Sequence, residues 1–311
     1  MTSPVLCALF FLTSLSSVLA ADGKTHSLSV PAVTPAVIAL ILFGLSALVH
    51  WIQFFRFGRQ PFMLALTLGM TAMAVGFVVR ILVSHNPTSL GLNIVSTLLI
   101  LLSPCLFLGL DYMILGRLAV MFGPDISNKA MFIAPTRVAT IFVWSDVGTF
   151  LVQALGGSMT TSSNINSVHL GNKIALIGLA LQLVSFALFM VLMLVFGSRV
   201  RTRFPHVWRG QQGKAFTVAG GEVGDWRILY FTLCVTCVAI LVRSIYRLVQ
   251  FIQGYGGYVS THEVFFYCFD SLPLWMAMSL YCAVWPPRFL NSPPQGEALE
   301  LRKQDGTPSY A

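Results

Sequence analysis

Residues 171–197 read GNKIALIGLALQLVSFALFMVLMLVFG, a stretch in which Lys173 is the single charged residue. An α-helix needs about 20 mainly apolar residues to cross the hydrocarbon core of a bilayer, and this stretch meets that requirement. Six more apolar runs of this kind occur, at 32–54, 61–83, 90–115, 137–156, 228–251 and 263–285. We therefore predict an all-α, polytopic membrane protein built as a bundle of seven transmembrane helices.

The overall composition agrees with a lipid-covered protein. Of the 311 residues, 56% are hydrophobic and 10% are charged, whereas a soluble domain carries about 25% charged residues. The net charge of +8 would suggest nucleic-acid binding in a soluble protein. Here most basic residues lie in the connections between apolar runs, so membrane orientation explains them and no nucleic-acid partner is expected.

The distribution of basic residues predicts the orientation of the helices. Of the 19 Lys and Arg residues, 14 fall in the first, third and fifth connections and in the C-terminal tail, which all lie on one side of the bundle. Connections rich in Lys and Arg stay in the cytoplasm. We therefore predict an N-terminus outside and a cytoplasmic C-terminus; the plasma membrane is the expected location on other grounds, namely the predicted N-terminal signal peptide and the family resemblance described below.

The two ends of the chain differ in character from the helical region. Residues 1–21 are apolar and end in small residues before Asp22, which indicates a signal peptide, with an uncleaved extra helix as the alternative. Residues 22–290 form the predicted membrane domain. Residues 291–311 are rich in proline and charge, which is typical of a disordered tail. The longest connection is expected at about 198–227, lying on the inner leaflet.

Several predicted helices carry ionisable or amide side chains, although a charge at mid-membrane costs about 2.5–3.5 kcal/mol on insertion scales. Such residues need a partner or a function. In the second, fourth and fifth helices they are Arg80, Asp146, Gln153 and Gln182. In the sixth and seventh helices they are Arg243, Arg247, Glu263, Tyr267 and Asp270, which helical spacing places on one face of each helix.

These residues allow two interpretations. Three arginines and three carboxylates in the outer half of the bundle form a formally neutral set, which would suit a structural ion-pair network. Alternatively, some of them line a polar cavity for an amphipathic lipid or small molecule, with carboxylates facing its ammonium or hydroxyl head. Both interpretations can hold together, with arginines structural and Asp146 or Glu263 facing the ligand.

The polar residues also carry a resemblance to a known family. The stretch RSIYRLVQFIQGYGGYVSTHEVFFYCFDSLP, residues 243–273, resembles the fungal RTA-like family, of the resistance-to-aminocholesterol type, also called lipid-translocating exporters. Further matches lie at Arg80 with the preceding Gly76-Phe77, at 112–117, at Asp146 with 153–157, and around Gln182. The similarity extends from the second to the seventh predicted helix.

The sequence departs from the family pattern at three places. Gln250 stands where the family usually has a glutamate, and Asp111 stands where it usually has a small or apolar residue. Trp285-Pro286-Pro287 replaces the usual histidine-proline-glycine. The resemblance implies a membrane protein connected with sphingoid long-chain-base release, sterol-analogue resistance or porphyrin uptake.

We weigh three functions on this basis. The leading prediction is a transporter or translocase of amphipathic lipids such as sphingoid long-chain bases or sterol-like toxic compounds, moved toward the outer leaflet. Gly210-Gln211-Gln212-Gly213-Lys214 lacks the spacing of a nucleotide-binding loop, so direct ATP hydrolysis is not expected. The second is a seven-helix lipid receptor or sensor. The third, a zinc-dependent membrane hydrolase, is disfavoured because the six histidines show no HxxxH pair; no enzyme activity, cofactor or metal is expected.

Overall fold

The computed structural model describes residues 33–86, 89–159, 165–209, 226–253 and 258–290. Within these residues every regular element is a helix. The predicted signal peptide at 1–21 and the predicted disordered tail at 291–311 lie outside the described residues.

Seven helices of the described part are long and apolar enough to cross a membrane, which confirms the predicted number. The first six each contain one long helix, in one case preceded by a 3₁₀ turn, and the seventh, Glu263–Ala283, is assembled from three consecutive elements. The six are α2 (Val33–Arg56), α3 (Leu64–His85, preceded by the 3₁₀ turn η1, Pro61–Met63), α4 (Leu90–Met121), α6 (Pro135–Met159), α7 (Ile165–Arg203) and α9 (Trp226–Gln253). The seventh consists of α11 (Glu263–Phe265), a π-helical segment η2 (Phe266–Ser271) and α12 (Leu272–Ala283).

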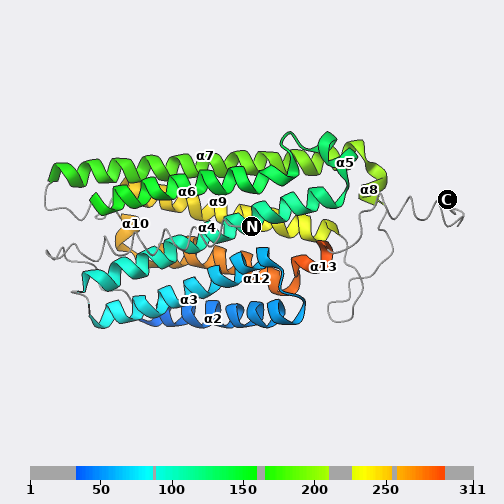
Figure 1. The fold of residues 1–311 in the computed structure, drawn as a ribbon. Coiled ribbons are helices and arrows are strands. Elements are labelled where there is room, and N and C mark those ends of the chain that lie inside the picture. The colour runs from blue at the N-terminus through cyan, green and yellow to red at the C-terminus, as the bar shows by residue number, and fades with distance from the viewer. Residues whose placement is uncertain (1–32, 87–88, 160–164, 210–225, 254–257, 291–311) are drawn as a thin grey trace, which may run out of the picture.

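Successive spanning helices run in opposite directions, side by side in one bundle (Figure 1). The short helices α5 (Pro124–Ala130), α8 (Pro205–Arg209) and α13 (Pro286–Leu290) lie at one end of this bundle. The short helix α10 (Tyr258–Thr261) lies at the opposite end (Figure 1). Every second connection therefore reaches the same end, as the seven-helix prediction requires.

Predicted ends of two helices were wrong: α4 continues to Met121, beyond the expected end at residue 115, and α7 begins at Ile165, before the expected residue 171. The fifth connection was expected to begin near residue 198, but α7 continues to Arg203, so Arg199, Arg201 and Arg203 lie on the helix. The segment after residue 197 contains no glycine or proline before Pro205. A proline disfavours helical geometry at the residue before it, which places the end of α7 next to Phe204.

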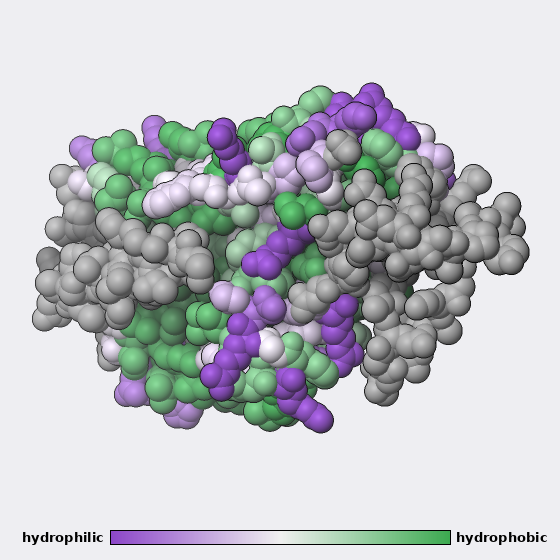
Figure 2. Space-filling model, turned by 45° about the vertical axis from the view of Figure 1, so that its right-hand side comes forward, coloured by the Kyte–Doolittle hydropathy of each residue, from purple (hydrophilic) through white to green (hydrophobic). Residues whose placement is uncertain are grey.

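The outer surface of the bundle is apolar. Along α7, for example, Ile177, Leu181, Val184, Leu188 and Val191 are each more than half exposed. Figure 2 turns the end with α5, α8 and α13 toward the viewer and shows hydrophilic residues gathered there, with hydrophobic residues along the flanks. A flank of this kind is stable when lipid covers it, because exposed large side chains on this scale would associate in water.

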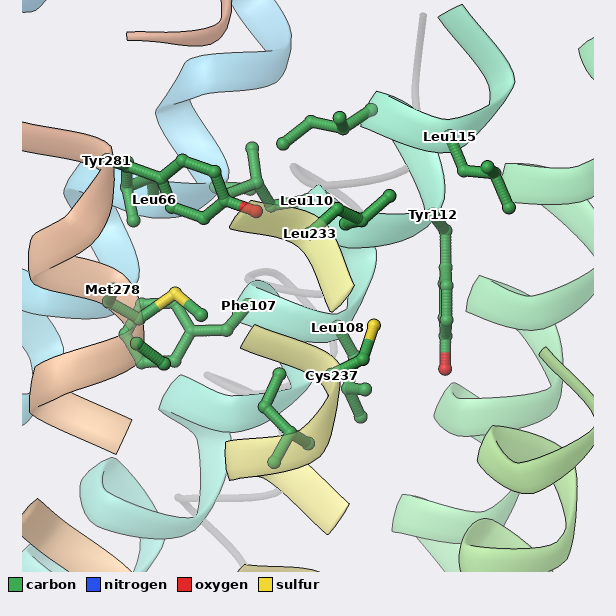
Figure 3. Packing of buried hydrophobic residues seen from close by; sticks show 14 of the residues in the cluster. Leu66, Phe107, Leu108, Leu110, Tyr112, Leu115, Leu233, Cys237, Met278 and Tyr281 are labelled. Atoms are coloured by element: carbon green, nitrogen blue, oxygen red, sulfur yellow. The ribbon is translucent and has the colours of Figure 1, made fainter. Parts of the chain in front are cut away.

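The core of the bundle centres on α4. Phe107, Leu110, Ile114 and Leu118 of this helix are fully buried. Side chains from α3, α9 and α12 fill the space around α4 (Figure 3). Because α4 packs against α3, α6 and α9, its polar residues face protein on several sides and not lipid.

Glycine residues bring α6 and α7 close together near one end. A Cβ added at Gly156 would lie 2.7 Å from the carbonyl oxygen of Gly171 and would overlap the backbone of Ala175. At Gly178 an added Cβ would lie 3.1 Å from the carbonyl oxygen of Thr149. Small residues at such contacts let helix backbones approach within a membrane.

We predict that Gly156→Ala destabilises the bundle by about 1–3 kcal/mol, because the new methyl group meets backbone atoms that cannot move aside. The matched control is Gly148→Ala on the same helix, where nothing lies within 4 Å of the added Cβ. That change is expected to be neutral or to stabilise by up to about 1 kcal/mol through helix propensity. Melting temperatures of the purified proteins in detergent measure both; equal melting temperatures would contradict the close α6–α7 contact.

Candidate functional site

Asp270 is the centre of a buried ion-pair network between η2 and α9. Its carboxylate accepts two hydrogen bonds from Arg247, from Nε to Oδ1 and from Nη2 to Oδ2, the latter at 3.1 Å. Nε of Arg243 lies 3.3 Å from the same Oδ1 atom. Asp270 and Arg243 are almost completely buried, so one carboxylate serves two arginines away from water. Helical spacing predicted that these arginines share a face, and the structure places both against Asp270.

A second ion pair lies beside the first. Nη2 of Arg80 on α3 donates a hydrogen bond of 2.9 Å to Oε1 of Glu263, and about a fifth of each side chain is exposed. The ring of Phe266 lies under both Arg80 and Arg247, at 4.8 and 5.5 Å from the guanidinium carbons. Tyr267 stacks on Phe77 of α3, with ring centroids 6.3 Å apart. The two ion pairs therefore form one cluster joining α3, α9 and the last spanning helix.

The π-helical segment η2 positions this cluster. It covers Phe266–Ser271, and it buries Asp270 and Ser271 together. A π-turn holds one residue more than an α-turn, and such segments occur frequently at functional sites. The sequence predicted a regular α-helical stripe here, and nothing in the residue pattern indicated the π-turn.

Asp146 does not join the ion-pair cluster. Its Oδ2 accepts a hydrogen bond of 2.7 Å from the hydroxyl of Tyr112 on α4. Its Oδ1 is buried and has no hydrogen-bond partner among the described residues. The Tyr112 ring packs edge-on against Phe189 of α7, with centroids 4.5 Å apart. The cluster thus contains three arginines and two carboxylates, which differs from the neutral set expected from the sequence.

Gln153 and Gln182 lie together between α6 and α7. Nε2 of Gln153 donates a hydrogen bond of 2.8 Å to Oε1 of Gln182. Both glutamines line a small cavity of about 30 Å³ between α4, α6, α7 and α9, and Arg243 and Arg247 line it from the other side. The structure therefore brings two predicted polar residues of α6 and α7 next to the arginines of α9.

Another buried polar cluster surrounds Asp111, a residue whose partner could not be predicted from the sequence. Its Oδ1 accepts a hydrogen bond of 2.9 Å from the hydroxyl of Tyr281 on α12, and its Oδ2 accepts one of 3.1 Å from Thr236 on α9. Asp111 is completely buried, so these hydroxyls compensate part of its loss of water. The group connects α4, α9 and α12, and only knowledge of which helices are neighbours could have revealed it.

A larger hollow lies on the lipid-facing side of α6 and α7, and we call it the α6–α7 groove. Its volume is about 670 Å³, within the range of about 300–1,000 Å³ typical of small-molecule sites. Its walls are mainly apolar, and Ser145, Thr149 and Ser185 supply hydroxyl groups. The lining residues are Phe132, Ile133, Ile141, Phe142, Ser145, Thr149, Leu181, Val184, Ser185, Leu188, Val191, Leu192 and Val195.

The described residues contain no group of three or more His, Cys, Asp or Glu side chains that could hold a metal ion. The buried carboxylates are instead surrounded by arginines or hydroxyl groups. Their arrangement favours binding and structural roles.

We predict that Asp270→Asn destabilises the protein by about 3–5 kcal/mol, because it leaves two buried arginines without a countercharge. Glu263→Gln changes the more exposed pair and is expected to cost about 1 kcal/mol or less. Both substitutions replace one carboxylate oxygen by an amide nitrogen, so a difference between them reflects the surroundings of the two carboxylates and not the chemical change itself. Melting temperatures in detergent provide the comparison, and an equal or larger loss for Glu263→Gln would contradict the central position of Asp270.

Comparisons with known proteins agree with this arrangement. The family model described as RTA1 like protein matches residues 66–293, which include every candidate site residue. Protein RTA1 of Saccharomyces cerevisiae is 34% identical over 219 residues, 70% of this chain and 63% of that relative. The chain therefore matches less than two thirds of the length of this relative.

Two further relatives have names that state an activity. The probable lipid transporter atnI of Emericella nidulans is 26% identical over 87% of this chain and 70% of its own length. The sphingoid long-chain base transporter RSB1 of Saccharomyces cerevisiae is 26% identical over 86% of this chain and 75% of its own length. No solved structure matches the chain. Because the family model covers most of the sequence, from α3 to the last spanning helix, the chain belongs to the RTA1-like protein family.

Proposed function

We propose that this protein is a translocase of amphipathic lipids that carry an ammonium group, with sphingoid long-chain bases as the first substrates to test. The name of the relative RSB1 supports this choice of substrate. Sterol-like toxic compounds are the second substrate class. Movement is directed toward the outer leaflet and does not require ATP hydrolysis by this chain.

The observation that carries the proposal is the buried carboxylate of Asp146, which does not itself line the α6–α7 groove but lies on α6 beside residues that do. Ser145 and Thr149, which line the groove, flank Asp146 on α6. Oδ1 of Asp146 is buried and lacks a hydrogen-bond partner among the described residues. An ammonium group would supply that partner in a charge-assisted hydrogen bond. Glu263 and Asp270 suit this role less well, since arginines already pair with both.

The α6–α7 groove fits the other part of such a lipid. On α7 its wall runs from Leu181 to Val195, about 20 Å at 1.5 Å per residue, and it faces Ile141 to Thr149 of α6 and Phe132 and Ile133, which precede α6. An alkyl chain can lie in it without entering the packed core. Helices α6 and α7 are in close contact at Gly156 and Gly178. The groove between the same two helices begins beyond this contact, at Leu181 on α7.

The orientation of the bundle follows from the positive-inside rule and forms part of the proposal. The end with α5, α8 and α13 carries Arg56, Lys129 and Arg288 at helix ends, which supports a cytoplasmic position. The α6–α7 groove, which begins at Phe132, then opens in the inner half of the membrane. A lipid entering from the inner leaflet would meet Asp146 as it moves outward.

We predict that purified protein in liposomes accelerates the transbilayer movement of a fluorescent sphingoid base in the absence of nucleotide. Asp146→Asn should remove most of this acceleration while the protein still folds, because the asparagine carbonyl can accept the Tyr112 hydrogen bond. The rate is read from loss of fluorescence after a membrane-impermeant quencher is added. No acceleration by folded wild-type protein that still binds the lipid would reject the translocase and favour the lipid sensor.

A matched pair of tryptophan variants tests whether the lipid moves through the α6–α7 groove. Leu188→Trp would fill the α6–α7 groove, whereas Leu194→Trp places the same bulk on the same helix outside the groove lining. The two leucines are similarly exposed, at 61% and 54%. We expect slower lipid movement for Leu188→Trp and a near wild-type rate for Leu194→Trp. Equal rates for the two variants would exclude the groove from the lipid path.

A further inference from the structure

The ion-pair cluster contains more positive than negative charge. Arg80, Arg243 and Arg247 face only Glu263 and Asp270 among the described residues. Asp146 does not correct this difference, because it forms no ion pair with the cluster and bonds to Tyr112. A buried charge without a counterion is costly, so the structure calls for one further negative charge near these arginines.

The uncompensated charge is found at Arg243. Its Nε shares Oδ1 of Asp270 with Arg247, and its Nη2 donates a hydrogen bond of 3.2 Å to the carbonyl oxygen of Ile100. Its Nη1 is buried and has no hydrogen-bond partner among the described residues. The residue is only 3% exposed, so bulk water does not complete this hydrogen bonding.

The small cavity beside Arg243 supplies a place for the missing partner. Arg243, Arg247, Gln153 and Gln182 contribute its polar lining, together with Ser244. No carboxylate lines it; the remaining side chains are Leu101, Pro104, Cys105, Leu108, Phe150, Leu179 and Ile240. An apolar wall strengthens the attraction between a guanidinium and an anion, because the local dielectric constant is low.

The cavity volume of about 30 Å³ limits what can bind. A bound water needs about 10–15 Å³ of such a cavity, so the space admits about two water molecules. That is room for a halide ion or one carboxylate group and not for a whole lipid. Water could satisfy the hydrogen-bond donor at Nη1, but it would leave the excess charge in place.

We propose that this cavity is a binding site for one monovalent anionic group, held by Arg243 and Arg247. The group is either a free small anion, such as chloride or formate, or the carboxylate of an amphiphile whose chain lies outside the cavity. The site differs from the ammonium site at Asp146, and anion binding does not require lipid translocation. Each proposal can therefore fail without the other.

The test measures the melting temperature of the full-length protein in nonionic detergent while the anion is changed at constant sodium concentration. Gluconate, which is too large for the cavity, is replaced stepwise by chloride or formate. We expect a saturable rise of about 2–4 °C in wild-type protein. A parallel titration compares laurate with uncharged dodecanol. A response to laurate alone would identify an amphiphile carboxylate, and a response to chloride or formate would identify a free anion.

Two cavity variants and two controls connect the response to the site. Arg243→Gln should abolish the rise in melting temperature that the anion causes. Gln182→Glu should also abolish this rise, and it should raise the melting temperature in gluconate because it supplies a fixed carboxylate. Gln53→Glu, which adds a carboxylate at a half-buried position on α2, should lower the melting temperature. Arg201→Gln, on the exposed end of α7, should keep the response.

Gln182→Glu keeps the test decisive if Arg243→Gln does not fold. A wild-type protein that responds to no anion would overturn the proposal. An anion response of wild-type size in Gln182→Glu would also overturn it, because the response would then arise outside the cavity.

Discussion

The bundle depends on one constraint, which is that a single buried carboxylate, Asp270, pairs with both arginines of α9. Arg243 and Arg247 lie one turn apart on the same face, so they need a carboxylate on the neighbouring helix at the same depth. The π-helical segment η2 buries Asp270 at this depth. The relative position of α9 and the last spanning helix is thereby fixed, and Arg80 with Glu263 extends the same connection to α3.

Buried polar side chains form separate clusters of different charge around α4. Asp146 and Tyr112 lie toward α6 and α7, and Asp111 lies toward α9 and α12. The arginine-lined cavity occupies a third position, between α4 and α9. A carboxylate with an unfilled acceptor and an arginine with an unfilled donor are therefore kept apart by packed side chains.

The sequence predicted the seven spanning helices well, because their number follows from hydrophobic length. Arg243, Arg247 and Asp270 also came together as their shared faces suggested. The partners of Asp146 and Asp111 could not be predicted, since each is a tyrosine hydroxyl on another helix. One sequence carries no information on which helices are neighbours, and a tyrosine in an apolar run looks the same whether it binds a carboxylate or only packs. The π-turn and the α6–α7 groove are likewise properties of the assembled bundle.

The dependence of α9 on Asp270 has a consequence for how the protein is made. Ribosomes synthesise the chain from its N-terminus, so both arginines of α9 leave the ribosome before the carboxylate with which they pair. Each arginine at mid-membrane costs about 2.5–3.5 kcal/mol on insertion scales, so α9 alone is a poor candidate for release into lipid. Because only a short segment separates Gln253 from Glu263, the last two spanning helices can wait together at the insertion machinery and enter the bilayer as a hairpin in which Asp270 already pairs with both arginines.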